Sequence, residues 1–193
     1  HILVASSPEL LEQGKGDIWD SGKIESDASQ WITYQGKTLK CNASYYWKVK
    51  IDTNKGATNW SAPAFWTTGL FNEADWQGQW IGLDRAAPGD SETQWSRLAA
   101  RYLRKEFAVK KDVKRATVHI AGMGLYELFI NGQRIGNQVL APAPTDYRKT
   151  ILYNTYDVTS LLQTENAIGV TLGNGRFYTM RQNYKPYKIP TFG

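Results

Sequence analysis

The amino-acid sequence predicts an all-β fold, and three observations favour it. Clusters of turn-forming residues recur at intervals of roughly ten residues, as in GKGD, DSGK, YQGK, TNKG, NGQR and GNGR. The runs between them are short and rich in Ile, Val, Tyr, Trp and Thr, which are residues enriched in strands. Aromatic residues make up 13% of the chain. The helical patches at 8–13 and 157–162 are too short for a helix bundle or an alternating α/β fold.

The length of 193 residues allows one large domain or two small ones. Hydrophobic residues make up 41% and charged residues 21% of the chain, so we expect a buried core. Mean hydropathy is −0.49, no apolar run approaches a membrane span, and the N-terminus lacks the cationic and apolar regions of a signal peptide. Because the sequence opens on HILVA without Met, we expect a processed chain or an excised fragment.

The few cysteines and histidines exclude several kinds of chemistry. Cys41 is the single cysteine, which rules out an internal disulfide and a cysteine-based zinc site. His1 and His119 alone offer little to a transition metal. The net charge of +5 and the pI of about 9.2 raise nucleic acid as a partner. The cations are dispersed along the chain, however, which weakens that interpretation.

The clearest strand of the first half covers residues 45–51. Its alternation predicts an inward face and an outward face; the inward set is Tyr45, Trp47, Val49 and Ile51, and the outward set is Tyr46, Lys48 and Lys50. We expect residues 64–68 to pair with this strand across a turn at 52–56. Together these segments resemble the late strands of an immunoglobulin-like sandwich.

A change of rhythm at residues 69–80, GLFNEADWQGQW, predicts a domain boundary near Gly78. We therefore expect two domains, covering residues 1–77 and 78–193. In the second, Asn131 and Gly132 predict a tight hairpin turn. The strands expected around that turn lie at 101–109, 116–121, 125–130, 133–135, 149–156 and 167–172.

No catalytic motif stands out. Gly122 and Gly124 fail the dinucleotide-binding pattern, because Glu127 replaces the third glycine and a strand follows instead of a helix. A phosphate-binding loop and a nucleophile elbow are absent from the sequence. A glycosidase requires a pair of carboxylates. The sequence gives no reason to pair any two of its candidates, which are Glu106, Glu127, Asp146 and Asp157. We interpret Glu127 as structural and Asp157 as a helix N-cap.

Two loops are candidates for binding. Asp146 lies in the proline-bounded loop PAPTDYRK, where a carboxylate beside Thr145 and Tyr147 can meet a sugar hydroxyl or a hard cation such as calcium. The alternative role for Asp146 is turn capping. The loop at 173–178, GNGRFY, can cradle a sugar, or it can be a glycine-rich turn before a strand.

Several segments, taken in order, carry a family resemblance. ILVASSPELL, IWDSGKIESD, YYWKVKIDTNKG and NWSAPAFWTTGL resemble the fibronectin-like module that opens bacterial α-L-rhamnosidases. ADWQGQWIG, LRKEFAV, GLYELFINGQRIG, LAPAPTDYRKTILYNTYDVTSLL and NAIGVTLGNGRFY resemble the rhamnosidase N-terminal domain that follows. The resemblance covers nearly the whole chain.

The resemblance implies a large enzyme that removes terminal L-rhamnose from glycosides by inverting hydrolysis. Its catalytic carboxylates would lie on an (α/α)₆ barrel beyond residue 193, so the chain alone is expected to be inactive. The implied folds are a fibronectin type III-like (immunoglobulin-like) sandwich over 1–77 and a jelly-roll, galactose-binding-like sandwich over 78–193. The second is expected to be truncated, because the family domain continues with further strands.

The resemblance also implies candidate sugar-binding residues. Its TDY loop gives Asp146 and Tyr147, and its G-x-G loop gives Asn174 and Gly175. Arg176 stands where relatives have Trp, so stacking on a sugar would fall to Phe177 or Tyr178. The full candidate set is Asp146, Tyr147, Asn174, Gly175, Arg176 and Tyr178. No cofactor is required, while calcium at Asp146 is an option because some relatives bind rhamnose through calcium.

Three functional hypotheses follow. The first is a non-catalytic accessory part of an α-L-rhamnosidase that aids recognition of L-rhamnose-containing glycans and is exported to the bacterial periplasm or exterior. The second is a structural scaffold that docks on the catalytic barrel and binds no sugar. The third, the least favoured, is a single-stranded nucleic-acid binder that uses the basic, aromatic tail at 176–192.

Overall fold

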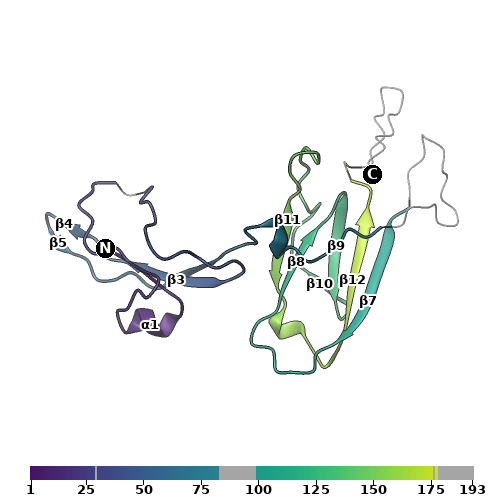
Figure 1. Ribbon diagram of the computed structural model, residues 1–193, viewed down its shortest axis with the longest axis horizontal. Coiled ribbons are helices and arrows are strands. Elements are labelled where there is room, and N and C mark those ends of the chain that lie inside the picture. Colours follow the sequence, from purple (N-terminus) through teal and green to yellow (C-terminus); the bar gives the residue numbers. More distant parts are fainter. Residues whose placement is uncertain (29, 83–98, 176, 178–193) are drawn as a thin grey trace. The chain divides into compact units, whose positions relative to one another are not determined.

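The computed structural model describes residues 1–28, 30–82, 99–175 and 177. The chain divides into two compact units, His1–Gln79 and Trp80–Gly193. Both units are built from antiparallel strands (Figure 1). The all-β prediction is therefore confirmed.

Unit 1 contains a four-stranded sheet with the order β2-β1-β3-β6. Its strands are β1 (Ile2–Ala5), β2 (Trp19–Asp20), β3 (Ser44–Val49) and β6 (Ala64–Thr67). A separate small hairpin joins β4 (Asp52–Thr53) to β5 (Gly56–Ala57), and a 3₁₀ turn, η1, covers Glu73–Asp75. Tyr45 of β3 lies opposite Trp66 of β6. The predicted pairing of these two segments across the turn at 52–56 is thus confirmed.

A short helix, α1 (Pro8–Glu12), packs on one face of this sheet. Ser7 starts the helix by accepting a hydrogen bond from the Leu10 amide, and Pro8 fits the first helical turn because its missing amide hydrogen has no helical partner there. Leu11 then lies fully buried against Leu3 and Ala5. Unit 1 therefore has its own hydrophobic cluster between α1 and the sheet.

The orientation predicted for β3 is wrong at Lys48. That side chain is only 9% exposed, because α1 covers the face on which Lys48 lies. Its ammonium donates to the Leu11 carbonyl and lies 5.0 Å from the centre of the Trp60 ring. Trp47, predicted to point inward, is 36% exposed instead. Alternation correctly separates the two faces, but it does not show which face the helix covers.

The opposite face of the sheet, which carries Trp47, is covered in part. Val4 and Tyr45 are buried there, and Tyr34 from the irregular segment after β2 packs edge-on against Trp19 at 5.2 Å between ring centres. The Tyr45 hydroxyl accepts a hydrogen bond from the Lys40 amide at 2.7 Å. The second layer on this face is thus supplied largely by coil.

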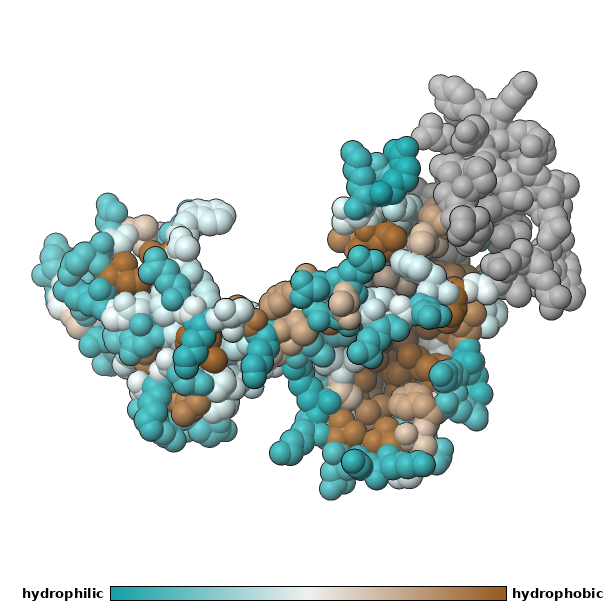
Figure 2. All heavy atoms as spheres, viewed as in Figure 1, coloured by the Kyte–Doolittle hydropathy of each residue, from teal (hydrophilic) through white to brown (hydrophobic). Residues whose placement is uncertain are grey.

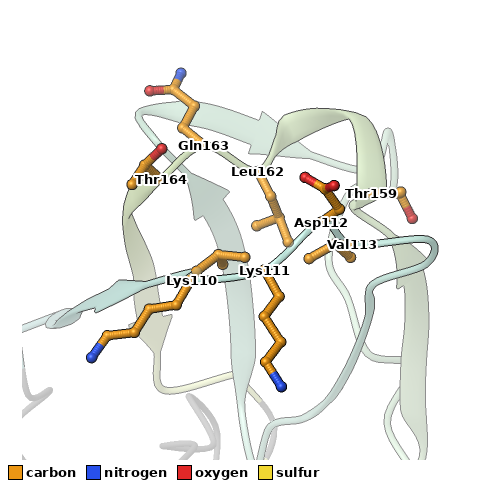
Figure 3. A pocket seen from close by; sticks show the side chains of 9 residues that line it. Lys110, Lys111, Asp112, Val113, Thr159, Leu162, Gln163 and Thr164 are labelled. Atoms are coloured by element: carbon orange, nitrogen blue, oxygen red, sulfur yellow. The ribbon is translucent and has the colours of Figure 1, made fainter.

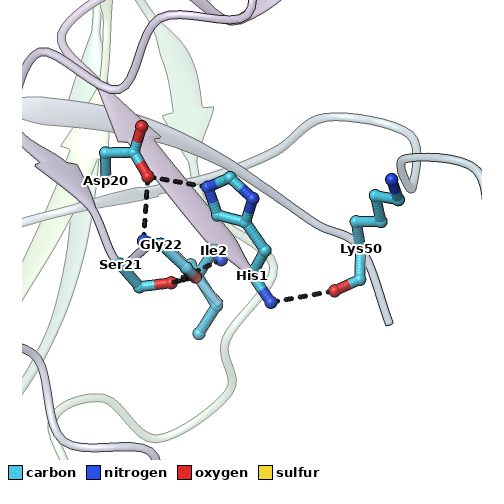
Figure 4. Close-up of polar contacts among 6 residues, drawn as sticks. All are labelled: His1, Ile2, Asp20, Ser21, Gly22 and Lys50. Atoms are coloured by element: carbon cyan, nitrogen blue, oxygen red, sulfur yellow. Dashed lines mark hydrogen bonds and ion pairs between the residues drawn. The ribbon is translucent and has the colours of Figure 1, made fainter. Parts of the chain in front are cut away.

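Polar contacts attach β1 to its neighbours (Figure 4). The His1 ring lies with Nε2 at 2.6 Å from an Asp20 carboxylate oxygen, and the Ile2 amide donates to the Ser21 hydroxyl at 2.8 Å. On the other side, the His1 backbone nitrogen donates to the Lys50 carbonyl at 2.9 Å. These bonds hold both edges of β1, which keeps Leu3 and Ala5 in the core.

The described residues of unit 2 form two antiparallel sheets. The larger has the order β10-β9-β12-β7, and the smaller pairs β11 with β8. The elements are β7 (Arg101–Ala108), β8 (Thr117–Ala121), β9 (Leu125–Ile130), β10 (Gln133–Ile135), β11 (Tyr153–Asp157), η2 (Thr159–Leu161) and β12 (Glu165–Gly173). Tyr126 and Leu128 are buried and pack against residues of both sheets, including Ile120 and Val170. The core of unit 2 therefore lies between the two sheets.

Three sequence-based expectations for unit 2 need correction. The strand predicted at 149–156 begins only at Tyr153, because the amides of Lys149 and Thr150 both donate to the Asp146 carbonyl and close a turn. The helical patch at 157–162 is a single 3₁₀ turn. The N-cap of this turn is Val158 and not Asp157 as expected; Asp157 lies one residue earlier, where its carboxylate accepts from the Thr159 amide at 2.9 Å.

The loops of unit 2 lie at two ends of the unit. The Gly124 end comprises the described residues of three loops, 122–124, 136–150 and 173–175 with Phe177, which are linked by the Tyr126–Ala141 bridge and the Tyr147–Phe177 ring contact. The Asn131 end comprises the loops at 109–116, 131–132 and 158–164. They lie at opposite ends of β9, which begins at Leu125 and finishes at Ile130.

Candidate functional site

The two candidate binding loops come together at the Gly124 end. The rings of Tyr147 and Phe177 meet edge-to-face with 5.3 Å between centres, and Phe177 is only 5% exposed. The TDY loop is thereby joined to the loop that carries Asn174 and Gly175. Sequence reasoning treated Phe177 only as a substitute platform for a sugar, whereas here it packs inside the unit.

Glycines bring these loops close to each other. Gly175 has φ +52°, and a Cβ placed on it would lie 2.8 Å from the carbonyl carbon of Gly124. Gly124 has φ +136°, and its own Cβ would lie 2.3 Å from the Gly173 oxygen. Both positions need glycine for the backbone angle and for the close approach. Gly124 lies at a bend between β8 and β9, and Gly175 has a packing role.

Asp146 lies in the turn at the tip of its loop. Its carboxylate accepts from the Arg148 guanidinium through both oxygens, at 3.1 and 3.2 Å. The Arg148 amide also donates to it at 3.3 Å. These hydrogen bonds from Arg148 lower the pKa of Asp146, so the side chain is ionised at neutral pH. Asp146 therefore organises the turn, as the turn-capping alternative expected.

Sequence reasoning missed Arg148. The signal was available, because an Arg two residues after an Asp in a tight turn can fold back on the carboxylate. The Arg148 side chain is 89% and the Asp146 side chain 40% exposed. Together these two side chains place a hydrogen-bond acceptor, the carboxylate, and several N–H donors of the guanidinium at the surface next to Tyr147. Arg176 and Tyr178, the other predicted site residues, lie outside the described residues.

The surroundings of Asp146 do not fit calcium. Calcium takes six to eight oxygen ligands, roughly, and Arg148 engages both oxygens of the Asp146 carboxylate with a positive charge. In the described part of the chain, no three His, Cys, Asp or Glu side chains gather in a way that could hold a metal ion. We therefore derive no binding step through calcium at this position.

The remaining predicted carboxylates lie on the outer face of the larger sheet or in turns. Glu127 accepts from Arg134 at 3.1 Å, which agrees with the structural role expected of it. Glu106 pairs with Arg104 at 2.6 Å on the neighbouring part of the same face. Both pairs are exposed, so each contributes little to stability.

An open hollow lies at the Asn131 end (Figure 3). Figure 3 shows Lys110 and Lys111 extending away from Gln163 and Thr164, so the hollow gathers no convergent set of polar groups. It is lined by Val109, Lys110, Lys111, Asp112, Val113, Thr159, Leu162, Gln163 and Thr164. We assign it no function.

Comparison with known proteins identifies the two units. Residues 1–72 match the family model described as the Rha78A-like, N-terminal immunoglobulin domain. Residues 111–192 match the α-L-rhamnosidase N-terminal domain. This chain is an N-terminal region of the α-L-rhamnosidase family. The resemblance expected from the sequence is therefore confirmed.

Relatives of this rhamnosidase N-terminal region are named α-L-rhamnosidases. One from Formosa agariphila is 39% identical over 96% of this chain, and one from Alteromonas sp. (strain LOR) is 36% identical over 90%. The chain spans only 21% and 19%, respectively, of the length of these relatives. It therefore corresponds to about one fifth of such a protein.

Solved structures show the same relation. An α-L-rhamnosidase from Dictyoglumus thermophilum matches 92% of this chain with a TM-score of 0.83 and 42% identity. One from Aspergillus terreus matches 97% with a TM-score of 0.73 and 28% identity. Each match covers 21% of the solved chain. Among the described residues of the present chain, no helix is long and apolar enough to cross a membrane.

Proposed function

We propose that this rhamnosidase N-terminal region is a non-catalytic accessory part of an enzyme that removes terminal L-rhamnose from glycosides, and that its Gly124 end aids carbohydrate recognition. The observation that supports this most is the meeting of the two candidate loops through Tyr147 and Phe177. It sets an exposed carboxylate and guanidinium beside an aromatic side chain on a single surface.

The chemistry of this surface suits a sugar. Sugar hydroxyls both donate and accept hydrogen bonds, and the Asp146–Arg148 pair offers an acceptor next to several donors. The apolar faces of sugar rings pack against aromatic side chains, and Tyr147 is half-buried with part of its surface at solvent. Export to the periplasm or cell exterior belongs to the same proposal, because rhamnose-bearing glycosides are the expected substrates.

A structural scaffold is the second candidate, and one observation favours it. Arg148 already engages both Asp146 oxygens, and Tyr147 already packs against the buried Phe177. These side chains would then hold the loops in shape for contact with the rest of the enzyme. In this case the Gly124 end binds no free sugar.

Calorimetric titration of the folded chain separates the two candidates. L-rhamnose is added with calcium and again with chelator, and L-fucose and D-glucose serve as controls. Carbohydrate recognition predicts saturable, rhamnose-selective heat, unchanged by chelator if the Asp146–Arg148 pair acts without a cation. Absence of heat at millimolar sugar would leave the scaffold as the function.

Variants locate the binding. Arg148→Ala and Asp146→Ala are expected to remove the rhamnose heat, while Asp112→Ala, an exposed aspartate at the Asn131 end, leaves it intact. Unfolding curves for each variant show whether a loss of binding is merely a loss of fold. Appreciable hydrolysis of a chromogenic rhamnoside by the purified chain would contradict the non-catalytic part of the proposal.

A further inference from the structure

Two adjacent aliphatic side chains are strongly exposed at the Gly124 end. Val139 is 80% and Leu140 70% exposed, in the loop that follows β10. Single exposed apolar residues are ordinary on a protein surface, whereas neighbouring large ones form a patch that favours contact with another surface. Figure 2 shows apolar side chains at the surface of both units. Val139 and Leu140 are among the most exposed large hydrophobic residues in the described part of the chain.

The loop that carries the pair is held in place on both sides. Before it, the Arg134 guanidinium donates to the carbonyls of Gly136 and Gln138, at 3.3 and 2.7 Å. After it, the Tyr126 amide donates to the Ala141 carbonyl at 2.8 Å. Val139 and Leu140 are therefore presented on a fixed backbone, and little conformational entropy is lost when they pack against a partner.

Leu140 adopts an unfavourable backbone conformation. Its φ is +60°, in the left-handed region that Gly and Asn adopt more easily than leucine does. This angle turns the chain so that Ala141 enters the core at 8% exposure while Leu140 points to solvent. Glycine or asparagine would make the same turn with less strain. An aliphatic side chain here indicates a compensating gain outside the isolated unit.

We propose that Val139 and Leu140 form a hydrophobic knob that packs into an apolar pocket on the part of the parental rhamnosidase polypeptide that lies outside this chain. About four fifths of the length of the curated relatives lies outside the matched span. Covalent linkage gives that remainder a high effective concentration, so a contact of two side chains suffices. The inference rests on the docking role of the second candidate function and does not require sugar binding.

A second copy of the chain is a poorer occupant. Stable interfaces between separate proteins bury about 1,200–2,000 Å² in total, far more than two side chains provide. The charged Asp146–Arg148 pair belongs to the same loop, 136–150, at the same end of the unit. A small apolar contact suits a surface that is already tethered to its partner.

Photo-cross-linking in the full-length parental enzyme tests the proposal. Val139 is replaced by p-benzoylphenylalanine, and cross-linked peptides are mapped by mass spectrometry. Cross-links to segments beyond the span of this chain are expected. The same replacement at Val113, which is 37% exposed at the Asn131 end, is the matched control and should not give those peptides. Cross-links only between two copies, or none outside this chain, would overturn the proposal.

A stability comparison adds an independent measurement. The double variant Val139→Ser, Leu140→Ser should leave the midpoint of unfolding of this chain unchanged or slightly raised, since both side chains are exposed and Leu140 is strained. In the full-length enzyme it should lower the midpoint for the same unit, while Val113→Ser changes neither. An unchanged full-length enzyme, or a loss of stability in this chain alone, would refute the docking role. Sugar calorimetry reports separately on carbohydrate recognition, so the two proposals fail in different experiments.

Discussion

Individual residues fix the shape of the Gly124 end, and Gly124 is the most demanding of them. A methyl group there would meet the Gly173 carbonyl oxygen at 2.3 Å, and the backbone angle already disfavours a side chain. We predict that Gly124→Ala lowers the free energy of unfolding by more than about 2 kcal/mol. Chemical denaturation followed by tryptophan fluorescence measures the change.

Gly132→Ala is the matched control for this prediction. Gly132 also has a positive φ, of +82°, but a Cβ there meets no atom within 4 Å. Gly132→Ala should therefore lower the free energy of unfolding by the backbone strain alone, about 1 kcal/mol. Equal losses for the two variants would show that the close contact at Gly124 relaxes freely.

His119 is expected to make unit 2 sensitive to acid. Its Nε2 is buried without a hydrogen-bond partner among the described residues, and its Nδ1 lies 3.0 Å from the Thr155 hydroxyl. Burial, with a smaller contribution from Arg115, lowers the pKa of His119 from its ordinary 6.5. The folded state therefore disfavours the charged ring, and the unfolded state binds the proton more readily.

The sign of the effect follows from linkage. Because the unfolded chain takes up more protons below pH 6.5, the free energy of unfolding should fall as the pH drops from 7 toward 5. We predict that His119→Gln removes this part of the pH dependence. Urea unfolding of both proteins at several pH values provides the measurement, and parallel curves would contradict the prediction.

Single residues also show how far sequence reasoning reaches. The Asn131–Gly132 turn was predicted from the pair alone, and Asn131 indeed has φ +52°. Its side chain, however, also bonds the Leu161 carbonyl and the Ala167 amide, 30 and 36 residues away. Local sequence reports the turn, because turn preference is local. It does not report those bonds, because they depend on which loops the fold brings together.

At the scale of elements, α1 and β3 are connected by one buried lysine. The Lys48 ammonium meets the Leu11 carbonyl at the end of the helix and the face of Trp60. We predict that Lys48→Ala destabilises unit 1 by about 1–2 kcal/mol, through lost packing of the stem, the lost hydrogen bond and the lost cation–π contact. Denaturation curves provide the measurement.

The exposed Lys55 supplies the comparison for this element. Lys55→Ala, in the β4–β5 hairpin, should change stability by less than about 0.5 kcal/mol. If Lys48→Ala were equally neutral, the buried contacts of Lys48 would contribute nothing net to stability, as occurs where desolvation offsets the attraction.

Most strands were predictable because alternation and turn residues are local signals. The hairpin partner of β3 and the strands around Asn131 follow from them. The strand prediction failed at 149–152, also because of a local interaction. Its residues have strand propensity, but the Asp146 carbonyl captures the amides of Lys149 and Thr150 and keeps the chain in a turn. The contact between Tyr147 and Phe177 joins loops 30 residues apart in sequence, and alternation cannot predict it.

On the scale of the whole molecule, the described residues form two separate hydrophobic clusters. Leu3, Ala5 and Leu11 form one, and Tyr126, Leu128 and Ala141 form the other. We predict two calorimetric transitions, because each cluster is completed within its own unit. Leu11→Ala should lower one midpoint and Leu128→Ala the other, each at a cost of about 2–5 kcal/mol.

A single unfolding transition that shifts in both variants would contradict this prediction. It would show that the two cores unfold together. Membership of the rhamnosidase family was predictable from the order of several motifs, since order along a chain is visible in sequence. The pairing of Arg148 with Asp146 at the Gly124 end was not, because the two side chains meet only after the turn has formed.

The edge of the larger sheet has a consequence for handling the protein. Within the described residues, β7 pairs with β12 on one side only, along eight residues. Such an edge can recruit a strand from another molecule, but Arg101, Arg104, Lys105 and Glu106 lie along it. Charge of this kind impedes intermolecular β-pairing. We therefore expect that substitutions which neutralise the charged side chains of β7 will make the protein aggregate at high concentration.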